Sequence, residues 1–292
     1  MYKLNCTYLK PFYITIWRNI MRVKHRFVFR SAEDNIVSFL QSRRINIDYD
    51  KMLNVFEIYE DNVDFCDVKE LLNTYNSTSL TQCIYTRKEL DLAEWLTVRS
   101  TWQNDYPQPE DNFGYIKATY DTSNYCKTCE NGLVQNNNFI LKKKPNWGSK
   151  NFMMLNWVPD ELFISDRVES VFCENNVKGL DYLKTYNRSK NEIKGTKQIY
   201  IQKTLDYGIK SESIEKEVVC DECKFKKTFT KTGYIYYDKH VFDNINIDLI
   251  KSCEKYGEVG CASTIFINQR VRKLIINNNF ARGLVFEPIQ LV

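Results

Sequence analysis

The segment LFISDRV at residues 162–168 recurs later in the chain as IFINQRV at residues 265–271. Each segment begins with apolar residues, which is typical of a buried strand. Each then reaches a polar residue, Ser165 or Asn268, that can cap the start of a helix. The two segments therefore predict the same strand-to-helix junction at two places.

The residues after each junction continue the parallel. An apolar trio at spacing i, i+3, i+4 follows in both segments, as on one face of a helix. The trios are Val168, Val171 and Phe172 in the first segment, and Val271, Leu274 and Ile275 in the second. Gly179 and Gly283 then end the expected helices, and a second apolar run follows each glycine. We predict two related strand–helix–strand halves, joined by a polar surface connection at 184–197.

A pair of cysteines with C-x-x-C spacing precedes each half. The pairs are Cys126 with Cys129 and Cys220 with Cys223. Two residues between cysteines let both sulfurs face one ion, and zinc takes four such ligands in a tetrahedron. We predict one closed, structural Zn²⁺ site held by these four cysteines. A redox pair, an iron–sulfur cluster, or substitution by His240, Cys253 or Cys261 are the alternatives.

Composition divides the chain into two expected domains of an α+β fold. Tyr106-Pro107-Gln108-Pro109 breaks helical patterning and resembles a linker. We therefore expect a small N-terminal α+β module over residues 1–105. Residues 106–292 would form a double-CxxC zinc-binding domain, a duplicated zinc ribbon plus strand–helix–strand.

The expected module alternates strands and helices. A period-two run places Val23, His25, Phe27 and Phe29 on one side of a strand. Further strands are expected at 54–60 and 80–85. Helices are expected after Ser31, Asp64 and Thr86, where Ser31-x-x-Asp34 and Thr86-x-x-Glu89 resemble capping boxes. The last helix is expected to carry Leu90, Ala93 and Leu96.

The bulk composition indicates a globular, soluble protein. Of the 292 residues 43% are hydrophobic and 14% aromatic, and the formal charge is +4, too balanced to indicate a membrane or nucleic-acid partner by itself. The apolar run at 12–17 is short and lacks a cleavage site, so we expect no signal peptide and a cytoplasmic location. Met21 is a second candidate start. In a cytoplasmic protein we expect the six scattered cysteines to be small buried residues: Cys6, Cys66, Cys83, Cys173, Cys253 and Cys261.

The chain offers little catalytic chemistry. His25 and His240 are its two histidines, and neither adjoins a nucleophile motif; we expect His240 to be an ordinary, partly buried residue. No glycine-rich phosphate loop is present. Asp160 with Glu222-x-Lys224 resembles a metal-dependent nuclease pattern, but Glu222 lies between two expected zinc ligands. We predict that the protein is not an enzyme.

Two lysine-rich stretches bear on nucleic acid. They are Lys142-Lys143-Lys144 and the stretch 224–231, where Phe225 and Phe229 are interleaved as stacking platforms would be. Acidic residues at 215–222 offset much of the second stretch. A solvated lysine face is the favoured interpretation. A zinc-ribbon nucleic-acid-binding or regulatory factor is the alternative function.

The order of these motifs resembles the bacterial double-CxxCG motif proteins over residues 120–292. Their shared features here are the two C-x-x-C pairs, the strand–helix junctions and a terminal Gly283-Leu284-x-Phe286-x-Pro288. The family pattern has glycine after each pair, whereas this chain has Glu130 and Lys224. The resemblance implies an immunity protein: a non-enzymatic, zinc-containing protein that neutralises a cognate protein toxin by binding it.

Overall fold

The computed structural model describes residues 20–30, 34–49, 52–75, 77–257 and 260–292. The chain forms two compact units, residues 1–89 and 90–292. Both helices and strands are abundant, so the fold is mixed α+β, as predicted. Within the described residues, no helix is both long enough and apolar enough to cross a membrane. The region of the 12–17 run, Cys6 and the Ser31 cap lies outside the described residues.

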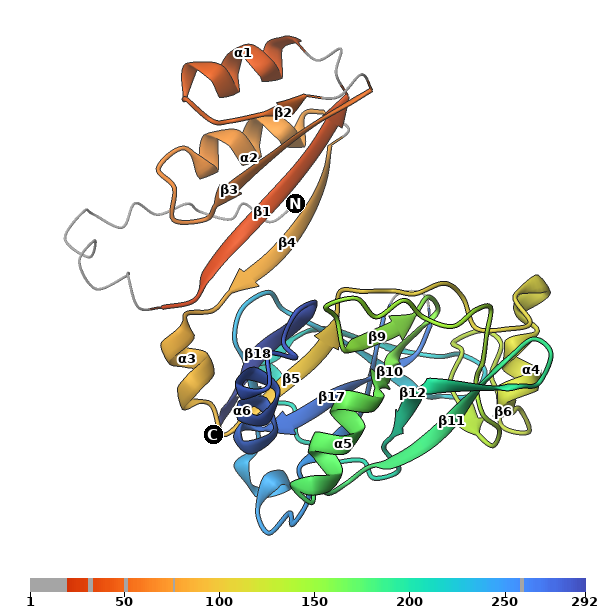
Figure 1. Cartoon of the computed structure of the whole chain (residues 1–292). Helices are drawn as coiled ribbons and strands as arrows, with labels where there is room; N and C mark the ends of the chain where they lie inside the picture. Colours follow the sequence, from red (N-terminus) through yellow and green to blue (C-terminus); the bar gives the residue numbers. More distant parts are fainter. Residues whose placement is uncertain (1–19, 31–33, 50–51, 76, 258–259) are drawn as a thin grey trace. The chain divides into compact units, whose positions relative to one another are not determined.

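The first unit is a four-stranded antiparallel sheet with two helices packed on one face (Figure 1). Its strand order is β2-β3-β1-β4. The elements are β1 (Arg22–Arg30), α1 (Asp34–Ser42), β2 (Asp48–Tyr49), β3 (Leu53–Tyr59), α2 (Phe65–Asn73) and β4 (Thr78–Ile84).

The period-two pattern in β1 is confirmed by burial. His25, Phe27 and Phe29 are buried, whereas Arg26 and Arg30 are exposed. The apolar side chains pack against Ile36 and Leu40 of α1 and against residues of α2. Alternate residues of a strand face opposite sides of a sheet, so one pattern supplies both the core and the polar face.

The junction between the units is the short helix α3 (Arg87–Leu92). Its predicted capping box is confirmed, because Thr86 N donates to Glu89 Oε2 at 2.7 Å and Glu89 N donates to Thr86 Oγ1 at 3.2 Å. The helix ends before Leu96, which lies instead in strand β5 (Trp95–Ser100).

The pairing of strand β5 explains why the boundary between the units lies earlier in the chain than predicted. It pairs with two strands from the end of the chain, β17 (Ala262–Asn268) and β18 (Leu284–Leu291). The units therefore divide between Glu89 and Leu90, earlier than the expected boundary at 105/106. The expected linker at 106–109 lies inside the second unit, where Pro107 and Gln108 are buried and Gln108 N donates to Ile140 O.

The second unit contains a five-stranded sheet, a seven-stranded sheet and a small two-stranded sheet. Their orders are β8-β11-β12-β10-β9, β13-β14-β16-β17-β5-β18-β15 and β6-β7. The remaining elements before β17 are α4 (Tyr115–Thr119), β6 (Tyr120–Asp121), β7 (Val134–Gln135), β8 (Ile140–Leu141), β9 (Phe152–Leu155), β10 (Val158–Ser165), α5 (Asp166–Glu174), β11 (Asp181–Asn187), β12 (Glu192–Tyr200), β13 (Ile214–Val219), β14 (Lys226–Thr230), β15 (Ile235–Tyr237) and β16 (Leu249–Tyr256). Helix α6 (Gln269–Asn277) follows β17.

Both predicted strand–helix–strand segments are present, as β10-α5-β11 and β17-α6-β18. The helix ends are nearly superimposable in backbone angles: Asn175 has φ −96° and ψ 9°, and Asn278 has φ −94° and ψ 8°. Gly179 and Gly283 follow with φ of 95° and 82°, where a side chain is strained.

In neither segment is the return strand next to the first strand. An antiparallel strand lies between them: β12 in the first segment and β5 in the second. Strand β12 follows its segment in sequence, whereas β5 precedes the second segment by most of the unit. The expected polar connection at 184–197 is the β11–β12 hairpin, in which Thr185 and Thr196 are buried.

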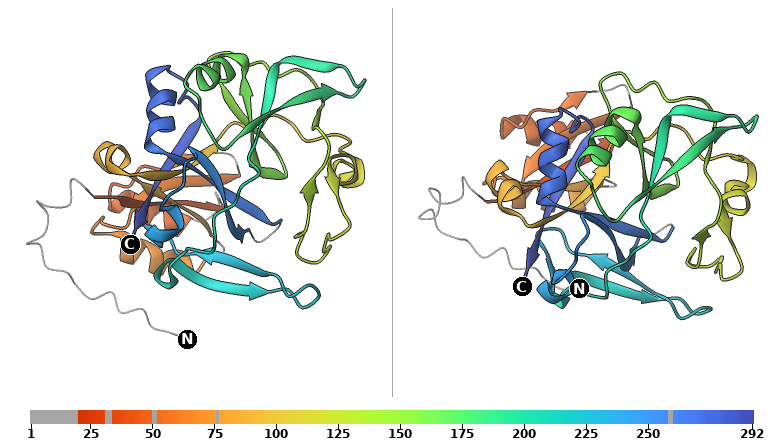
Figure 2. Two further views of the ribbon diagram at one scale, coloured as in Figure 1. Left: turned by 90° about the horizontal axis from the view of Figure 1, so that it is seen from below. Right: turned by 60° about the horizontal axis from the view of Figure 1, so that its bottom comes forward.

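Helices α5 and α6 contact each other (Figure 2). One core holds residues of β5, β10 and β17 together with the whole α5 trio and with Val271 and Ile275 of the α6 trio. Arg270 of α6 connects the helices: its guanidinium donates to the backbone oxygens of Asn175 and Asn176 and to both carboxylate oxygens of Asp248. A cation at the C-terminal end of α5 also complements the helix dipole there.

Candidate metal centre

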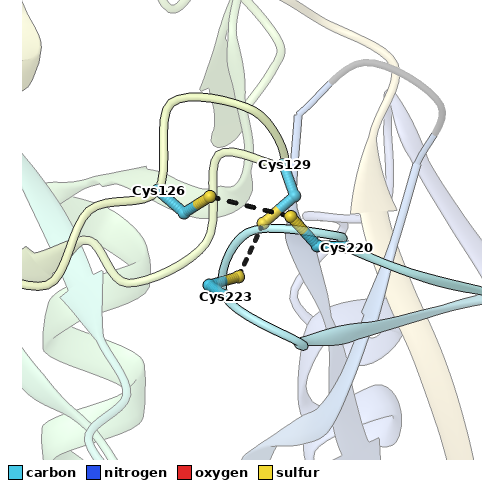
Figure 3. A group of neighbouring side chains, drawn as sticks. All are labelled: Cys126, Cys129, Cys220 and Cys223. Carbon is cyan, nitrogen blue, oxygen red and sulfur yellow. Dashed lines mark hydrogen bonds between the residues drawn. The ribbon is translucent and has the colours of Figure 1, made fainter.

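The two C-x-x-C pairs lie on separate turns of the second unit. Cys126 and Cys129 are in the loop between β6 and β7, and Cys220 and Cys223 are in the turn between β13 and β14. The four side chains point toward one another from the two turns (Figure 3). The structure thus brings all four predicted metal ligands together.

The sulfur positions fit one four-coordinate ion. Cys126 Sγ lies 3.7 Å from Cys220 Sγ, Cys129 Sγ lies 3.4 Å from Cys223 Sγ, and all four sulfurs lie within 4.8 Å of one another. With metal–sulfur bonds of about 2.3 Å, tetrahedral sulfurs are about 3.8 Å apart. A metal ion can therefore occupy the centre with small side-chain adjustments.

Both turns have the same backbone hydrogen bonds. Glu130 N donates to Cys126 O and Cys126 N donates to Asn131 O in the first turn. In the second turn, Lys224 N donates to Cys220 O and Cys220 N donates to Phe225 O, with the same residue spacings. This common backbone explains how both pairs aim their sulfurs inward.

The residue after each pair has a left-handed backbone. Glu130 has φ 62° and Lys224 has φ 59°. Glycine adopts this region readily, whereas other L-residues do so at a cost of about 1–2 kcal/mol. Each turn therefore imposes a conformation that suits glycine at a position occupied by a longer, charged residue.

The thiols differ in acidity because their surroundings differ. A hydrogen bond from the Cys223 backbone N–H lowers the pKa of Cys220 to about 7. Loss of solvent on burial raises the pKa of Cys129 to about 12. Since metal ligands must be thiolates, a bound cation would displace the proton from Cys129 and stabilise the thiolate form.

The alternative ligands lie elsewhere. Among the described residues, the only grouping of His, Cys, Asp and Glu side chains that fits a metal is the four-cysteine cluster. His240 is exposed, contrary to the expected partial burial: its side chain is 89% exposed and bonds Asp243. Cys261 Sγ lies 3.8 Å from Asn131 Oδ1. The expectation of burial for the scattered cysteines is wrong, because Cys66 and Cys173 are exposed and Cys83, Cys253 and Cys261 are partly exposed.

The residues considered for catalysis have structural partners. His25 is buried against the ring of Phe65, and its Nε2 lies 2.8 Å from Glu60 Oε1. The two carboxylates of the nuclease-like pattern have separate partners. Asp160 accepts a hydrogen bond from Ser263 N, whereas Glu222 Oε2 lies 3.5 Å from Cys126 Sγ.

Two of the four lysines in the second basic stretch have polar partners. Lys226 pairs with Glu217 at 2.7 Å, and Lys227 is buried with its ammonium group donating to Gly260 O. In the first stretch, Lys142 lies 3.7 Å from Asp105 and 3.9 Å from Glu110. These contacts leave fewer cations for phosphate than the sequence suggests.

A buried polar network was not foreseen from the sequence. Glu161 of β10 pairs with Lys251 of β16 at 2.7 Å and accepts from Gln198 of β12, which exchanges hydrogen bonds with Gln135. Burial raises the pKa of Glu161 despite the adjacent ammonium group. The only signal of this network in the sequence was Glu161, a charged residue directly before the apolar residues 162–164. The network joins strands of both large sheets.

Comparison with known proteins finds no matching family model and no matching curated relative.

Proposed function

We propose that Cys126, Cys129, Cys220 and Cys223 bind one Zn²⁺ ion, which holds the β6–β7 loop against the β13–β14 turn. The proposal rests on the convergence of four sulfurs within 4.8 Å. Four thiolates complete the tetrahedral shell that zinc prefers and leave no position for a reactive water. The metal would stabilise the fold without taking part in catalysis.

On this basis we propose that the protein is a non-enzymatic interaction protein of the double-CxxCG type, an immunity protein that binds and neutralises a bacterial protein toxin. Two observations support it. The turns share one backbone pattern, and their left-handed residues, Glu130 and Lys224, occupy the positions where that family has glycine. The matched ends of α5 and α6 support a duplicated zinc-ribbon domain within the same proposal. A reducing cytoplasm, where thiols persist, is the compartment that suits such a site.

Elemental analysis of the purified protein tests the zinc site. The expected result is one zinc per chain, lost in Cys129→Ser and kept in Cys173→Ser, since Cys173 is an exposed residue of α5. A metal-free protein that stays folded with four freely titratable thiols contradicts the proposal.

Co-expression with toxins encoded beside the gene tests the immunity role. Protection should saturate near one-to-one, because a binding protein acts stoichiometrically. Protection by a trace amount, abolished by His25→Ala or His240→Ala, would indicate an enzyme. Salt-sensitive binding to nonspecific DNA without toxin binding would favour the nucleic-acid alternative, because phosphate contacts release counterions.

A further inference from the structure

A group of four aromatic side chains in mutual contact, two of them exposed, lies on the second unit. Trp157 is 42% exposed and Phe113 is 53% exposed, and their ring centroids are 4.6 Å apart. The Trp157 ring also packs on Tyr106 at 4.4 Å and on Tyr115 at 5.8 Å. We name these four residues the aromatic ridge. Large exposed aromatics of this kind are the residues that most often dominate protein interfaces.

The two exposed members have left-handed backbones, which bulky residues seldom adopt. Phe113 has φ 53° and Trp157 has φ 68°. Trp157 lies in the two-residue turn between β9 and β10, where Leu155 pairs with Val158. Glycine or asparagine adopts such a position with least strain. Residues with strained backbones cluster at binding and active sites, which singles out these two exposed rings as candidates for binding a partner.

Hydrogen bonds hold the ridge in one conformation. The backbone N–H and the side-chain amide of Asn156 both donate to Asp105 O at 3.0 Å. Phe113 N donates to Glu110 O at 3.2 Å, and Tyr115 N donates to Pro109 O at 2.7 Å. The loop at 105–113 and the β9–β10 turn are thereby joined. A preorganised surface loses little entropy when a partner binds.

The border of the ridge is acidic, although the chain as a whole is basic. The segment 105–113 contains Asp105, Glu110 and Asp111 and no Lys, Arg or His. Two cations lie at this segment: Lys142 is shared between Asp105 and Glu110 at 3.7 and 3.9 Å, and the Arg188 guanidinium donates to Gln108 Oε1 at 2.6 and 2.9 Å. Three carboxylates against two cations still leave the border acidic, and Asp111, an exposed residue, forms no ion pair among the described residues. Carboxylates around aromatic faces repel phosphate and attract cations.

We infer that the aromatic ridge is a docking surface for a basic protein segment. Arginine or lysine side chains of the partner would lie over Trp157 and Phe113, and Asp111 would pair with them. This inference rests on the proposed function in that the partner would be the neutralised toxin. Phosphate-bearing ligands do not fit the acidic border.

The first experiment uses an oligoarginine peptide as the probe, with an oligoglutamate peptide of equal length and duplex DNA for comparison. Trp157→Asn and Phe113→Asn remove the rings but keep residues that tolerate a left-handed backbone. Each should weaken oligoarginine binding at least about 10-fold in calorimetry. Tyr207→Asn is the matched control, because Tyr207 is 49% exposed and distinct from the ridge. Circular dichroism and melting should show that all variants fold.

The outcomes separate this inference from the proposed function. Wild-type protein that does not bind oligoarginine, or ridge variants that bind it as tightly as Tyr207→Asn, overturn the docking surface. So does binding of DNA or oligoglutamate that depends on Trp157. If a neighbouring toxin is neutralised, Trp157→Asn should abolish one-to-one protection; retained protection refutes the ridge and leaves the immunity role intact. If no toxin is neutralised but oligoarginine binding still requires Trp157, the immunity role fails and the docking surface stands.

Discussion

Cys126 Sγ lies 3.7 Å from Cys220 Sγ, although 94 positions separate the two residues in the chain. A metal bound by both cysteine pairs would link these distant segments in the folded chain. Because only folding brings its ligands together, binding of the metal would add directly to the free energy of unfolding. The proposed zinc would therefore stabilise the folded state through its four bonds to sulfur.

We expect Cys129→Ser to lower the free energy of unfolding of the second unit by about 3–5 kcal/mol, because a structural metal contributes folding free energy directly. The first unit has its own core and should stay folded. Limited proteolysis should therefore leave a resistant N-terminal fragment that ends near residue 89. Cys173→Ser should resemble the wild type. Simultaneous degradation of both units in Cys129→Ser would show that they do not fold independently.

Glycine after each cysteine pair should stabilise the protein. Glu130→Gly and Lys224→Gly remove the strain of a left-handed backbone at these positions. Glycine also raises the conformational entropy of the unfolded chain, which opposes this gain. We expect a net increase in the free energy of unfolding of about 0.5–1 kcal/mol. Chemical denaturation measures the change. Lys127→Gly, inside the first pair and without a positive φ, should destabilise instead. Equal losses in all three variants would refute the strain at Glu130 and Lys224.

Two glycines with positive φ should differ sharply in their tolerance of alanine. A Cβ at Gly179 would lie 2.3 Å from Leu249 O, whereas a Cβ at Gly148 meets nothing within 4 Å. Gly179→Ala should cost more than about 3 kcal/mol, since backbone must move as well as adopt a strained angle. Gly148→Ala should cost about 1 kcal/mol from the angle alone. Melting temperatures of the two variants give the comparison, and similar losses would contradict the close approach of Gly179 to β16.

The Asp248–Arg270 pair should contribute stability that depends on pH. Burial opposes ionisation of Asp248, but hydrogen bonds from Arg270, Lys178 and Asn268 outweigh it and lower its pKa. A lowered folded-state pKa gives stability that is present above the unfolded value of about 3.9 and is lost as pH falls through the folded value.

Asp248→Asn should therefore be less stable than the wild type at neutral pH, by about 1–3 kcal/mol. The difference should shrink below about pH 4, as the wild-type carboxylate is protonated. Urea denaturation across this range measures both proteins, with the exposed Asp206→Asn as control. A difference that stays constant into acid would show that the charge of Asp248 is not what stabilises the contact.

Local sequence patterns predicted the helices and strands whose residues show a clear apolar periodicity. The alternation at His25, Phe27 and Phe29 specified β1, and the apolar trios specified α5 and α6. Of the two polar caps, Asn268 accepts a hydrogen bond from Val271 N as expected, whereas the Ser165 hydroxyl donates to Asn151 Oδ1 and does not cap α5. The interpretation of 106–109 as a linker was wrong because two prolines break a helix equally well inside a domain. Residues 184–197 do not connect the two halves, because they form the β11–β12 hairpin of the first half and bury Thr185 and Thr196. The tip of this hairpin, residues 188–191, is exposed, as expected of a surface segment.

By itself, the sequence determined the local features: the four candidate ligands, the two strand–helix junctions and the capping box at Thr86. Each depends on residues within one or two turns of chain, where spacing alone sets geometry. Only the tertiary structure decided that β5 belongs to the second unit, that Glu161 meets Lys251, and that Trp157 contacts Phe113. Those relationships depend on strand pairing and packing between distant segments, and a strand pattern states which face is buried but not which strand lies beside it.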